Sequence, residues 1–484
     1  MSQIARLFAF AFVAACGASN GAAIPDSTKG GSTTPPPVAV DSRDWTRFNV
    51  DEARSGVFAA TTGITAAALP TMQRQQVTLD GTVDASPIYL HGVSVGGATH
   101  DAFFVTTSYG KTIAIDAGNG ATLWEFTPPG YSQWAGTSRI TNVTPVADPD
   151  RTAIYSASPD GHIQKLAVAD GHSIWSTAIT MLPTREKIAS ALNYSRGHVI
   201  AVTGGYIGDA PPYQGHVVLL DAASGQLLHV WNSLCSDRAG LIDPSSCRES
   251  DSAIWGRAGA VVDSATGNIF VATGNALWDG RTNWGDAVIE LDANATRILA
   301  NFTPSNTETL NATDEDVGST SPVILDATHV LQGGKDGRIR VLDLQVMSGD
   351  TPHRGGETQS ISTPSGSALF TAPAIWRRTD AVWIFAADGG ATTAWTYRAG
   401  TLTKAWSNSN AGTSPVVAGG FLFVYDPSGA LRMYDPTTGE SLGQLQCGSG
   451  HWNSPIVVDK RIALPEGSAN SHRTTGVLNI WRLP

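Results

Sequence analysis

A short apolar strand that opens on Ser-Pro, or on a closely related pair, recurs eight times along this chain. The repeat has a period of about 40 to 70 residues, and each unit contains the alternation typical of β-strands. Radial blades of four strands around a central channel have this signature. The sequence therefore predicts an all-β protein, an eight-bladed β-propeller of four-stranded blades. The clear strand starts are Ser86-Pro87, Thr144-Pro145, Ser321-Pro322, Ala372-Pro373, Ser414-Pro415 and Ser454-Pro455, and the weaker ones are Ala189-Ser190-Ala191 and Arg257-Ala258-Gly259.

The last repeat supplies only three strands, at about residues 454–458, 461–464 and 477–483. A strand-like segment, Gln73 to Leu79, precedes the first Ser-Pro pair. We expect this N-terminal strand to fill the outer position of the last blade and to close the ring, because closure removes exposed sheet edges. Seven blades are the alternative, if the unit near residue 190 is an insertion.

Composition agrees with many short strands and tight turns. Gly accounts for 51 of the 484 residues, and only 15% of residues are charged. The net charge of −11 and the lack of a dense Lys/Arg stripe argue against binding to a phosphate backbone. Nucleic acid is therefore excluded as an expected partner.

The N-terminus has the features of an export signal. Arg6 is followed by an apolar run, Leu7 to Ala15, that is too short to span a bilayer. The run ends in Val-Ala-Ala-Cys, which predicts a lipoprotein signal peptide over residues 1–16 with a lipid on Cys16. An ordinary signal peptide cleaved near residue 22 is the alternative. Residues 17–41 are expected to be a flexible tether and residues 42–484 the propeller. The prediction is an exported protein of the cell envelope, a periplasmic or outer-membrane lipoprotein that contacts the membrane only through its anchor.

Three cysteines follow Cys16. Cys235 and Cys247 flank one loop, and export favours oxidation, so we expect a disulfide between them. Cys447 is then left as a small buried apolar side chain. The chain has no CxxCH motif, so no haem c is expected to be attached.

Blade geometry places two classes of loop on one face: those before a first strand and those between the second and third strands. Most acidic, amide, cationic and aromatic groups of the chain's loops fall in these two classes. Such convergence is how binding sites are built on rigid scaffolds, so we expect a site on this face. A second group, His451, Trp452, Asn453, Glu466, Asn470 and His472, should meet where the ring closes, and hydrogen bonds that join the closing blade are favoured there over a metal site.

These loops resemble the quinoprotein dehydrogenases, the eight-bladed propellers that hold pyrroloquinoline quinone (PQQ), and are most similar to the polyvinyl-alcohol-dehydrogenase-like branch. The resemblance covers most of the chain as a repeat and is specific across about residues 204–343. The motifs that carry it are Gln214 to Asp221, Ile254-Trp255-Gly256, Asp263 to Gly267, Thr273-Gly274-Asn275, Asp314 to Pro322 and Gly334-Lys335-Asp336-Gly337.

The resemblance implies a calcium ion that polarises the quinone, a carboxylate base for the alcohol proton and hydride transfer to the quinone. The chain differs from the family pattern in two respects. It has no adjacent cysteines, and it has Asp209 near the position where the family has a Glu ligand. The implied roles are catalysis for Asp314 and Asp316, contact with PQQ for Lys335, Trp255 and Arg257, and metal binding for Asn275, Asp316 and Asp209.

The leading hypothesis is an exported PQQ-dependent dehydrogenase-like protein that oxidises a small-molecule or polymer alcohol, or a sugar-like hydroxyl, and passes electrons to a separate acceptor. The alternative is a non-catalytic PQQ-like propeller lipoprotein that acts as a binding or assembly scaffold in the envelope. A hydrolase on a propeller scaffold comes last, because the chain has no Gly-x-Ser-x-Gly element.

Overall fold

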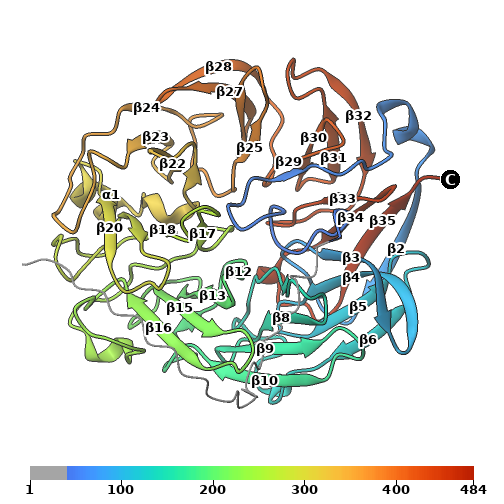
Figure 1. Cartoon of the computed structure of the whole chain (residues 1–484), viewed down its shortest axis with the longest axis horizontal. Helices are drawn as coiled ribbons and strands as arrows, with labels where there is room; N and C mark the ends of the chain where they lie inside the picture. The colour runs from blue at the N-terminus through green and yellow to red at the C-terminus, as the bar shows by residue number, and fades with distance from the viewer. Residues whose placement is uncertain (1–40) are drawn as a thin grey trace, which may run out of the picture. The chain divides into compact units, whose positions relative to one another are not determined.

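The computed structural model describes residues 41–484. The predicted signal peptide, Cys16 and all but the last residue of the predicted tether lie outside this range. Eight antiparallel sheets are arranged around a central axis (Figure 1). Both weaker strand starts begin blades, at β12 (Asn193–Ser195) and β17 (Val261–Val262). The prediction of eight blades is confirmed and the seven-bladed alternative is wrong.

Blades are numbered here in chain order of their first strands. Blade 1 consists of β3 (Ile88–Val95), β4 (Ala98–Thr106), β5 (Thr112–Asp116) and β6 (Thr122–Phe126). Blade 2 consists of β7 (Val146–Ala147), β8 (Ala153–Ala157), β9 (His162–Ala167) and β10 (Ser173–Ala178). Blade 3 consists of β12, β13 (His198–Val202), β15 (His216–Asp221) and β16 (Leu227–Asn232). Blade 4 consists of β17, β18 (Ile269–Ala272), β19 (Val288–Leu291) and β20 (Ile298–Phe302).

The second half of the ring repeats this pattern. Blade 5 consists of β21 (Val323–Ile324), β22 (His329–Gly333), β23 (Arg338–Asp343) and β24 (Gln359–Ser362). Blade 6 consists of β25 (Ala374–Arg377), β26 (Val382–Ala387), β27 (Thr392–Arg398) and β28 (Thr401–Asn408). Blade 7 consists of β29 (Val416–Ala418), β30 (Phe421–Asp426), β31 (Ala430–Tyr434) and β32 (Ser441–Gln446). Blade 8 consists of β33 (Ile456–Val458), β34 (Arg461–Glu466), β35 (Gly476–Arg482) and β2 (Gln73–Leu79).

The remaining elements are short. β1 (Val57–Phe58) adds to β29 in parallel, and β11 (Glu186–Lys187) pairs with β14 (Gly204–Gly205). The α-helix is α1 (Thr307–Thr313), and the 3-10 turns are η1 (Ala66–Thr71), η2 (Tyr131–Gln133), η3 (Pro244–Ser246), η4 (Val317–Ser319) and η5 (Ala469–Ser471). Nowhere in residues 41–484 does a helix have the length and apolar character needed to cross a bilayer.

A tryptophan at the end of one blade packs on a glycine of the next. Trp124 on β6 lies against Gly171, whose Cβ, if present, would come within 2.5 Å of the indole ring. The indole Nε1 also donates to the Val168 carbonyl of the same turn at 2.8 Å. Glycine is needed there both for this approach and for its positive φ of 74°. Such tryptophans anchor one blade on the next, and the arrangement recurs for Trp175 on Gly225 and for Trp406 on Gly439.

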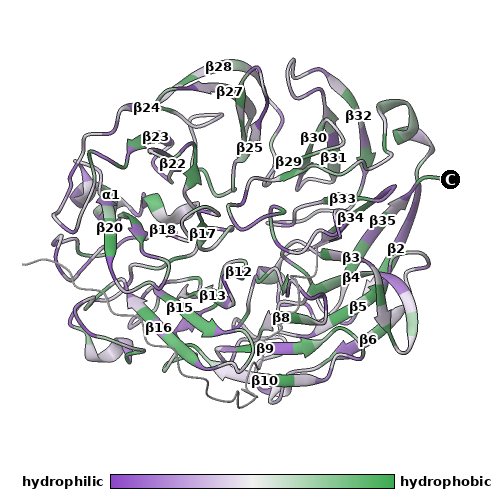
Figure 2. Ribbon diagram, in the orientation of Figure 1, coloured by the Kyte–Doolittle hydropathy of each residue, from purple (hydrophilic) through white to green (hydrophobic). Residues whose placement is uncertain are grey.

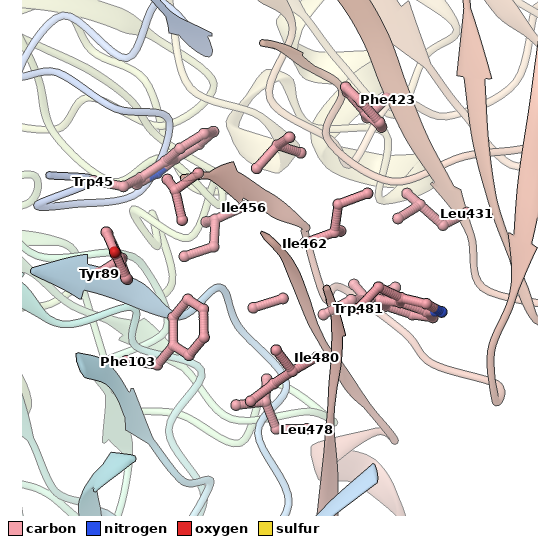
Figure 3. Packing of buried hydrophobic residues seen from close by; sticks show 14 of the residues in the cluster. Trp45, Tyr89, Phe103, Phe423, Leu431, Ile456, Ile462, Leu478, Ile480 and Trp481 are labelled. Atoms are coloured by element: carbon pink, nitrogen blue, oxygen red, sulfur yellow. The ribbon is translucent and has the colours of Figure 1, made fainter. Parts of the chain in front are cut away.

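The core lies between the blades. Every residue of β8 is buried, because neighbouring sheets cover both of its faces. Apolar residues accordingly follow the strands of each blade (Figure 2). Figure 3 shows the cluster where blade 8 meets blade 1, with Tyr89 and Phe103 on one side and Ile480 and Trp481 on the other.

Residues 44–62, which we call the strap, run along the inner strands of the ring and were not predicted from the sequence. In Figure 1 this blue segment crosses the middle of the view. The strap forms backbone hydrogen bonds with inner-strand residues of blades 1, 2, 4, 6 and 7 and with the turn after the inner strand of blade 8. Arg54, a buried strap residue, also donates to the carbonyl of Leu192, just before the inner strand of blade 3, at 2.8 Å. The bonded residues are Tyr89, Ala147, Val262, Ile375 and Val417 in inner strands and Lys460 in the turn.

The N-terminal strand closes the ring as predicted. β2 pairs antiparallel with β35 over its whole length, from Gln73 opposite Arg482 to Leu79 opposite Gly476. Leu79 is 2% exposed in the core, whereas Gln76 faces solvent. The outer strand of blade 8 therefore comes from the other end of the propeller chain.

Asp84, between β2 and β3, joins the last blade to the first. Its buried carboxylate accepts hydrogen bonds from His451 Nδ1 at 2.8 Å, from the Trp452 amide at 2.8 Å and from the Ala469 amide at 3.0 Å. Burial alone would raise the pKa of Asp84, but the hydrogen bond and the charge of His451 outweigh it and lower the pKa. The expected hydrogen bonding at the closing blade is confirmed for His451 and Trp452.

We expect Leu79→Ala to lower the free energy of unfolding by about 2–5 kcal/mol, because it removes buried contacts at the ring closure. Urea-induced unfolding followed by tryptophan fluorescence measures the change. Gln76→Ala, on the solvent side of the same strand, is the control and should change stability by less than about 0.5 kcal/mol. Equal effects of the two substitutions would contradict a contribution of the buried face of β2 to the free energy of unfolding.

We expect Asp84→Asn to lower the free energy of unfolding at neutral pH by on the order of 3 kcal/mol, because His451 loses its buried partner. Since the folded-state pKa of Asp84 is lowered, its contribution is present above the unfolded pKa of about 4 and is lost as the pH falls through the folded value. Urea unfolding between pH 3 and 7 should therefore show a weaker acid dependence in the variant.

The control for Asp84→Asn is Asp170→Asn, which breaks an Asp–His pair at 2.6 Å whose two side chains are 61% and 64% exposed. This substitution should leave the free energy of unfolding nearly unchanged, because solvent screens an exposed ion pair. An unchanged acid dependence in Asp84→Asn would show that the closure does not rely on this charge.

Candidate functional site

One pocket of about 580 Å³ opens on the face predicted to carry the site. Its walls come from blades 2, 3, 4, 5 and 8, and from the loops before first strands and between second and third strands. A larger hollow of about 810 Å³ lies beside the strap, and none of the predicted site residues line it. The 580 Å³ pocket brings together all seven predicted catalytic, cofactor and metal residues, which are Asp209, Trp255, Arg257, Asn275, Asp314, Asp316 and Lys335.

The loops of blades 4 and 5 can meet here because a glycine allows a close approach and an aspartate takes a left-handed conformation. A Cβ on Gly318 would lie 2.5 Å from the Thr273 carbonyl carbon, so only glycine lets the two loops touch. Asp314 ends α1 in the left-handed conformation, with φ at 57°, which turns the chain toward blade 4. The Asn275 amide then donates to Asp314 Oδ1 at 2.7 Å.

Lys335 is the centre of a charged cluster. Its Nζ lies 2.6 Å from Asp314 Oδ1 and 2.8 Å from Asp316 Oδ2. The same ammonium sits 5.1 Å from the centroid of the Trp255 ring. Its backbone amide also donates to the Asp316 carbonyl at 2.9 Å, which fixes the two loops relative to each other. Opposite charges in one partly buried cluster hold these side chains in place.

The protonation states follow from burial and neighbouring charge. Burial raises the pKa of Asp316 to about 6 against the opposing effect of Lys335, so this carboxylate is ionised at neutral pH. Burial alone would lower the pKa of Lys335, but the charge of Asp316 outweighs it and the pKa is raised. Behind them, burial and then the charge of Asp316 raise the pKa of Asp286 to about 8, so that carboxyl is mostly protonated at pH 7.

The donor set fits a hard divalent cation. Asn275 Oδ1 and Asp316 Oδ1 are buried and have no hydrogen-bond partner within residues 41–484. Asp209 lines the same pocket and accepts a hydrogen bond from the Tyr213 hydroxyl at 3.1 Å on Oδ1 alone. Carboxylate and amide oxygens are the ligands that Ca²⁺ prefers. The two free buried oxygens are therefore suited to cation binding.

An aromatic row crosses between opposite blades. The Trp255 and Phe370 rings lie 5.9 Å apart between centroids, and Phe370 and Trp452 lie 5.3 Å apart. Arg257 stacks on Trp452 at 4.4 Å. Phe370 and Trp452 were not predicted as site residues in the sequence. Each precedes the strand start of its blade by two residues, at Ala372-Pro373 and Ser454-Pro455, and that position is a usable signal.

Sequence reasoning also missed a lysine of the pocket. Lys187, on β11, is 7% exposed and lines the pocket. It precedes the weak strand start at Ala189, so it belongs to the same class of loop. Away from the pocket, Cys235 and Cys247 are joined by a disulfide, and Cys447 is free and partly buried.

Known proteins share this fold. The quinohemoprotein alcohol dehydrogenase of Comamonas testosteroni aligns with 91% of this chain and 80% of its own, with a TM-score of 0.68 and 16% identity. A europium-containing methanol dehydrogenase aligns with 92% of this chain and 98% of its own, with a TM-score of 0.64 and 16% identity. BamB from Moraxella catarrhalis aligns with 85% of this chain and 97% of its own, with a TM-score of 0.52 and 14% identity. At such identities these likenesses establish the fold.

Sequence comparison gives the family. No curated protein matches the chain. Residues 57–345, more than half of the chain, match the PQQ_2 family, whose description is outer membrane protein assembly factor BamB. The chain therefore belongs to the PQQ_2 family, and its fold is the eight-bladed propeller of the PQQ-repeat type.

Proposed function

We propose that this protein binds PQQ and a divalent cation such as Ca²⁺ in the 580 Å³ pocket and oxidises an alcohol or a sugar-like hydroxyl. The observation that carries the proposal is the convergence of predicted cation ligands and of Lys335 in one pocket, where two buried oxygens accept no hydrogen bond from any residue in the range 41–484. Similarity of fold to alcohol and methanol dehydrogenases supports it.

The residues divide into two groups by what they can do. Asn275 and Asp316, with Asp209 at the edge, would hold the cation. Lys335, Trp255 and Arg257 would hold the quinone, by charge in the case of the two cations and by stacking in the case of Trp255. When bound, the cation and quinone supply Lewis acidity and a hydride acceptor.

Asp314 is placed to act as the base. Its Oδ1 is shared by Lys335 and Asn275, which orients the carboxylate and leaves Oδ2 to accept the proton of a hydroxyl. Lys335 stabilises the negative charge of both aspartates and leaves the three side chains with one negative charge in excess, which a divalent cation would offset. The substrate follows from the sequence prediction, a small-molecule or polymer alcohol as in the polyvinyl-alcohol-dehydrogenase-like branch, with a separate electron acceptor.

A second candidate function is a scaffold in the cell envelope. The family description and the fold shared with BamB from Moraxella catarrhalis favour it. A scaffold has no need for a buried Lys335–Asp316 pair beside unbonded oxygens, and buried polar atoms without partners cost stability. We therefore place the dehydrogenase first.

We expect the purified protein to bind PQQ with Ca²⁺, to unfold at a higher temperature when both are present and to reduce a dye on addition of alcohol. A ligand at 100 times its Kd adds about 2.7 kcal/mol of stability. Asp314→Asn should lower the rate of dye reduction by about 10² to 10⁴, because it removes the base, while leaving the thermal shift in place.

The matched control is Asp80→Asn. Asp80 is also an exposed aspartate that pairs with a lysine, and this lysine, Lys111, contacts Glu125 as well. Asp80 does not line the pocket. Its rate should equal that of the wild type. No stabilisation by PQQ and Ca²⁺, together with recovery of an envelope partner in a pull-down, would favour the scaffold instead.

We also propose export to the envelope with a lipid on Cys16, as the sequence predicts. Cys16→Ser should abolish incorporation of labelled fatty acid and move the protein from the membrane fraction to the soluble fraction of cells. Cys447→Ser, at the free cysteine of the propeller, is the control and should leave both unchanged. A wild-type protein that takes up no labelled fatty acid would instead support an ordinary signal peptide cleaved further along the chain, and unaltered labelling of Cys16→Ser would contradict Cys16 as the lipid site.

A further inference from the structure

Lys187 points into the pocket because of strand alternation. Successive side chains of β11 face opposite ways. Glu186 faces the core of blade 3, where His216 Nε2 lies 3.1 Å from its carboxylate. Lys187 therefore faces the other way, and it lines the 580 Å³ pocket while being 7% exposed.

The ammonium of Lys187 has no acceptor. Within residues 41–484 no carboxylate lies within ion-pair distance of its Nζ, and no carbonyl or side chain accepts a hydrogen bond from it. Burial, and then the charge of Arg257, lower the pKa of Lys187 to about 7. The charge of Asp84 offsets these effects only in part, so Lys187 lacks the direct ion pairs that Lys335 forms with its two aspartates.

Arg257 also lacks a full set of partners for its charged group. Its Nε is buried without a hydrogen-bond partner among the described residues, and burial lowers its pKa to about 10. The nearby carboxylate of Asp84 is already bound by His451 and by backbone amides at the ring closure. Stacking on Trp452 at 4.4 Å holds the guanidinium plane, which suits two-point contact with a planar anion.

We propose that Lys187 and Arg257 form an anion-binding subsite of the pocket, which takes a carboxylate group of the pocket's ligand. Two largely desolvated cations share only the charge of Asp84, which already binds His451, so they carry excess positive charge that a ligand carboxylate would offset at both. The aromatic row of Trp255, Phe370 and Trp452 beside them favours an aromatic or otherwise flat anion. This subsite rests on the pocket and does not depend on redox activity.

The test uses isophthalate, an aromatic dicarboxylate, and its neutral analogue isophthalamide as probes. Titration calorimetry with the metal-free, quinone-free protein at pH 6.5 should show binding of isophthalate and none of isophthalamide. Lys187→Met and Arg257→Met should each weaken isophthalate binding by about 10- to 100-fold, the range for a charge-assisted hydrogen bond. Lys404→Met, at an exposed lysine on β28, should bind as the wild type does.

The pH dependence separates Lys187 from its titratable neighbours, which are Asp84 and His451; Arg257 stays charged throughout. Because the neutral amine cannot attract an anion, wild-type affinity should fall as the pH rises from 6 to 9. Lys187→Arg keeps its charge over this range, so it should bind isophthalate with a much weaker pH dependence. A pH dependence that is the same in both proteins would assign it to His451 or Asp84 and contradict the role of Lys187.

Thermal unfolding gives a second readout. Lys187→Met removes a buried charge that Asp84 offsets only in part, so the ligand-free variant should be at least as stable as the wild type. A clear loss of stability would mean that Lys187 has a structural role, and it would overturn the proposal. So would a wild-type protein that fails to bind isophthalate, or Lys187→Met and Arg257→Met variants that bind it with unchanged affinity.

Two sources of the carboxylate are separated by repeating the titration with PQQ present. Loss of isophthalate binding through competition would assign the subsite to the quinone's own carboxylates. Retained binding would assign it to a carboxylate-bearing substrate, such as a hydroxy acid. Isophthalate binding that depends on Lys187 in a protein that does not bind PQQ would support the subsite while contradicting the proposed dehydrogenase.

Discussion

Closure of the ring between blade 8 and blade 1 is the constraint on which the rest of the structure depends. Blades contact only their neighbours, so an open ring would leave one apolar face and one sheet edge exposed. β2 supplies the missing strand, and Asp84 joins the two blades through His451 and Trp452. Because Trp452 also stacks with Arg257, the same junction forms one wall of the pocket. Closure and site geometry are thus physically connected.

The two sides of the pocket differ in whether their charged side chains form ion pairs with neighbouring residues. On the side of blades 4 and 5, Lys335 offsets one of the two negative charges of Asp314 and Asp316, which both lie within hydrogen-bond distance. On the side of blades 3 and 4, Lys187 and Arg257 have no ion pair within residues 41–484, and the charge of Asp84 offsets theirs only in part. The first side therefore keeps a negative charge that suits a cation, whereas the second keeps a positive charge that suits an anion. A pocket with a cation-binding side, an anion-binding side and an aromatic row between opposite blades is suited to a flat ligand that carries several oxygens.

Much of the fold follows from local sequence patterns. The Ser-Pro strand starts are short-range signals, and the structure has a blade after each of them. Even β2 was identified, because the last repeat was one strand short. The strap could not be identified, since residues 44–62 pair with one residue from each of several blades and show no strand periodicity of their own. Lys187 was missed because a lone lysine before a weak strand start has no local signal of burial.

The sequence by itself determined the number of blades, their order and the face on which chemically active loops would lie, because each depends on patterns within about 50 residues. Only the tertiary structure decided which charged side chains have a partner of opposite charge. Asp314 and Lys335 are close in sequence and bind each other, whereas Lys187 and Arg257 are 70 residues apart and share one pocket wall. Whether a buried charge has a partner depends on loops from different blades meeting across the axis, and no local pattern encodes that distance.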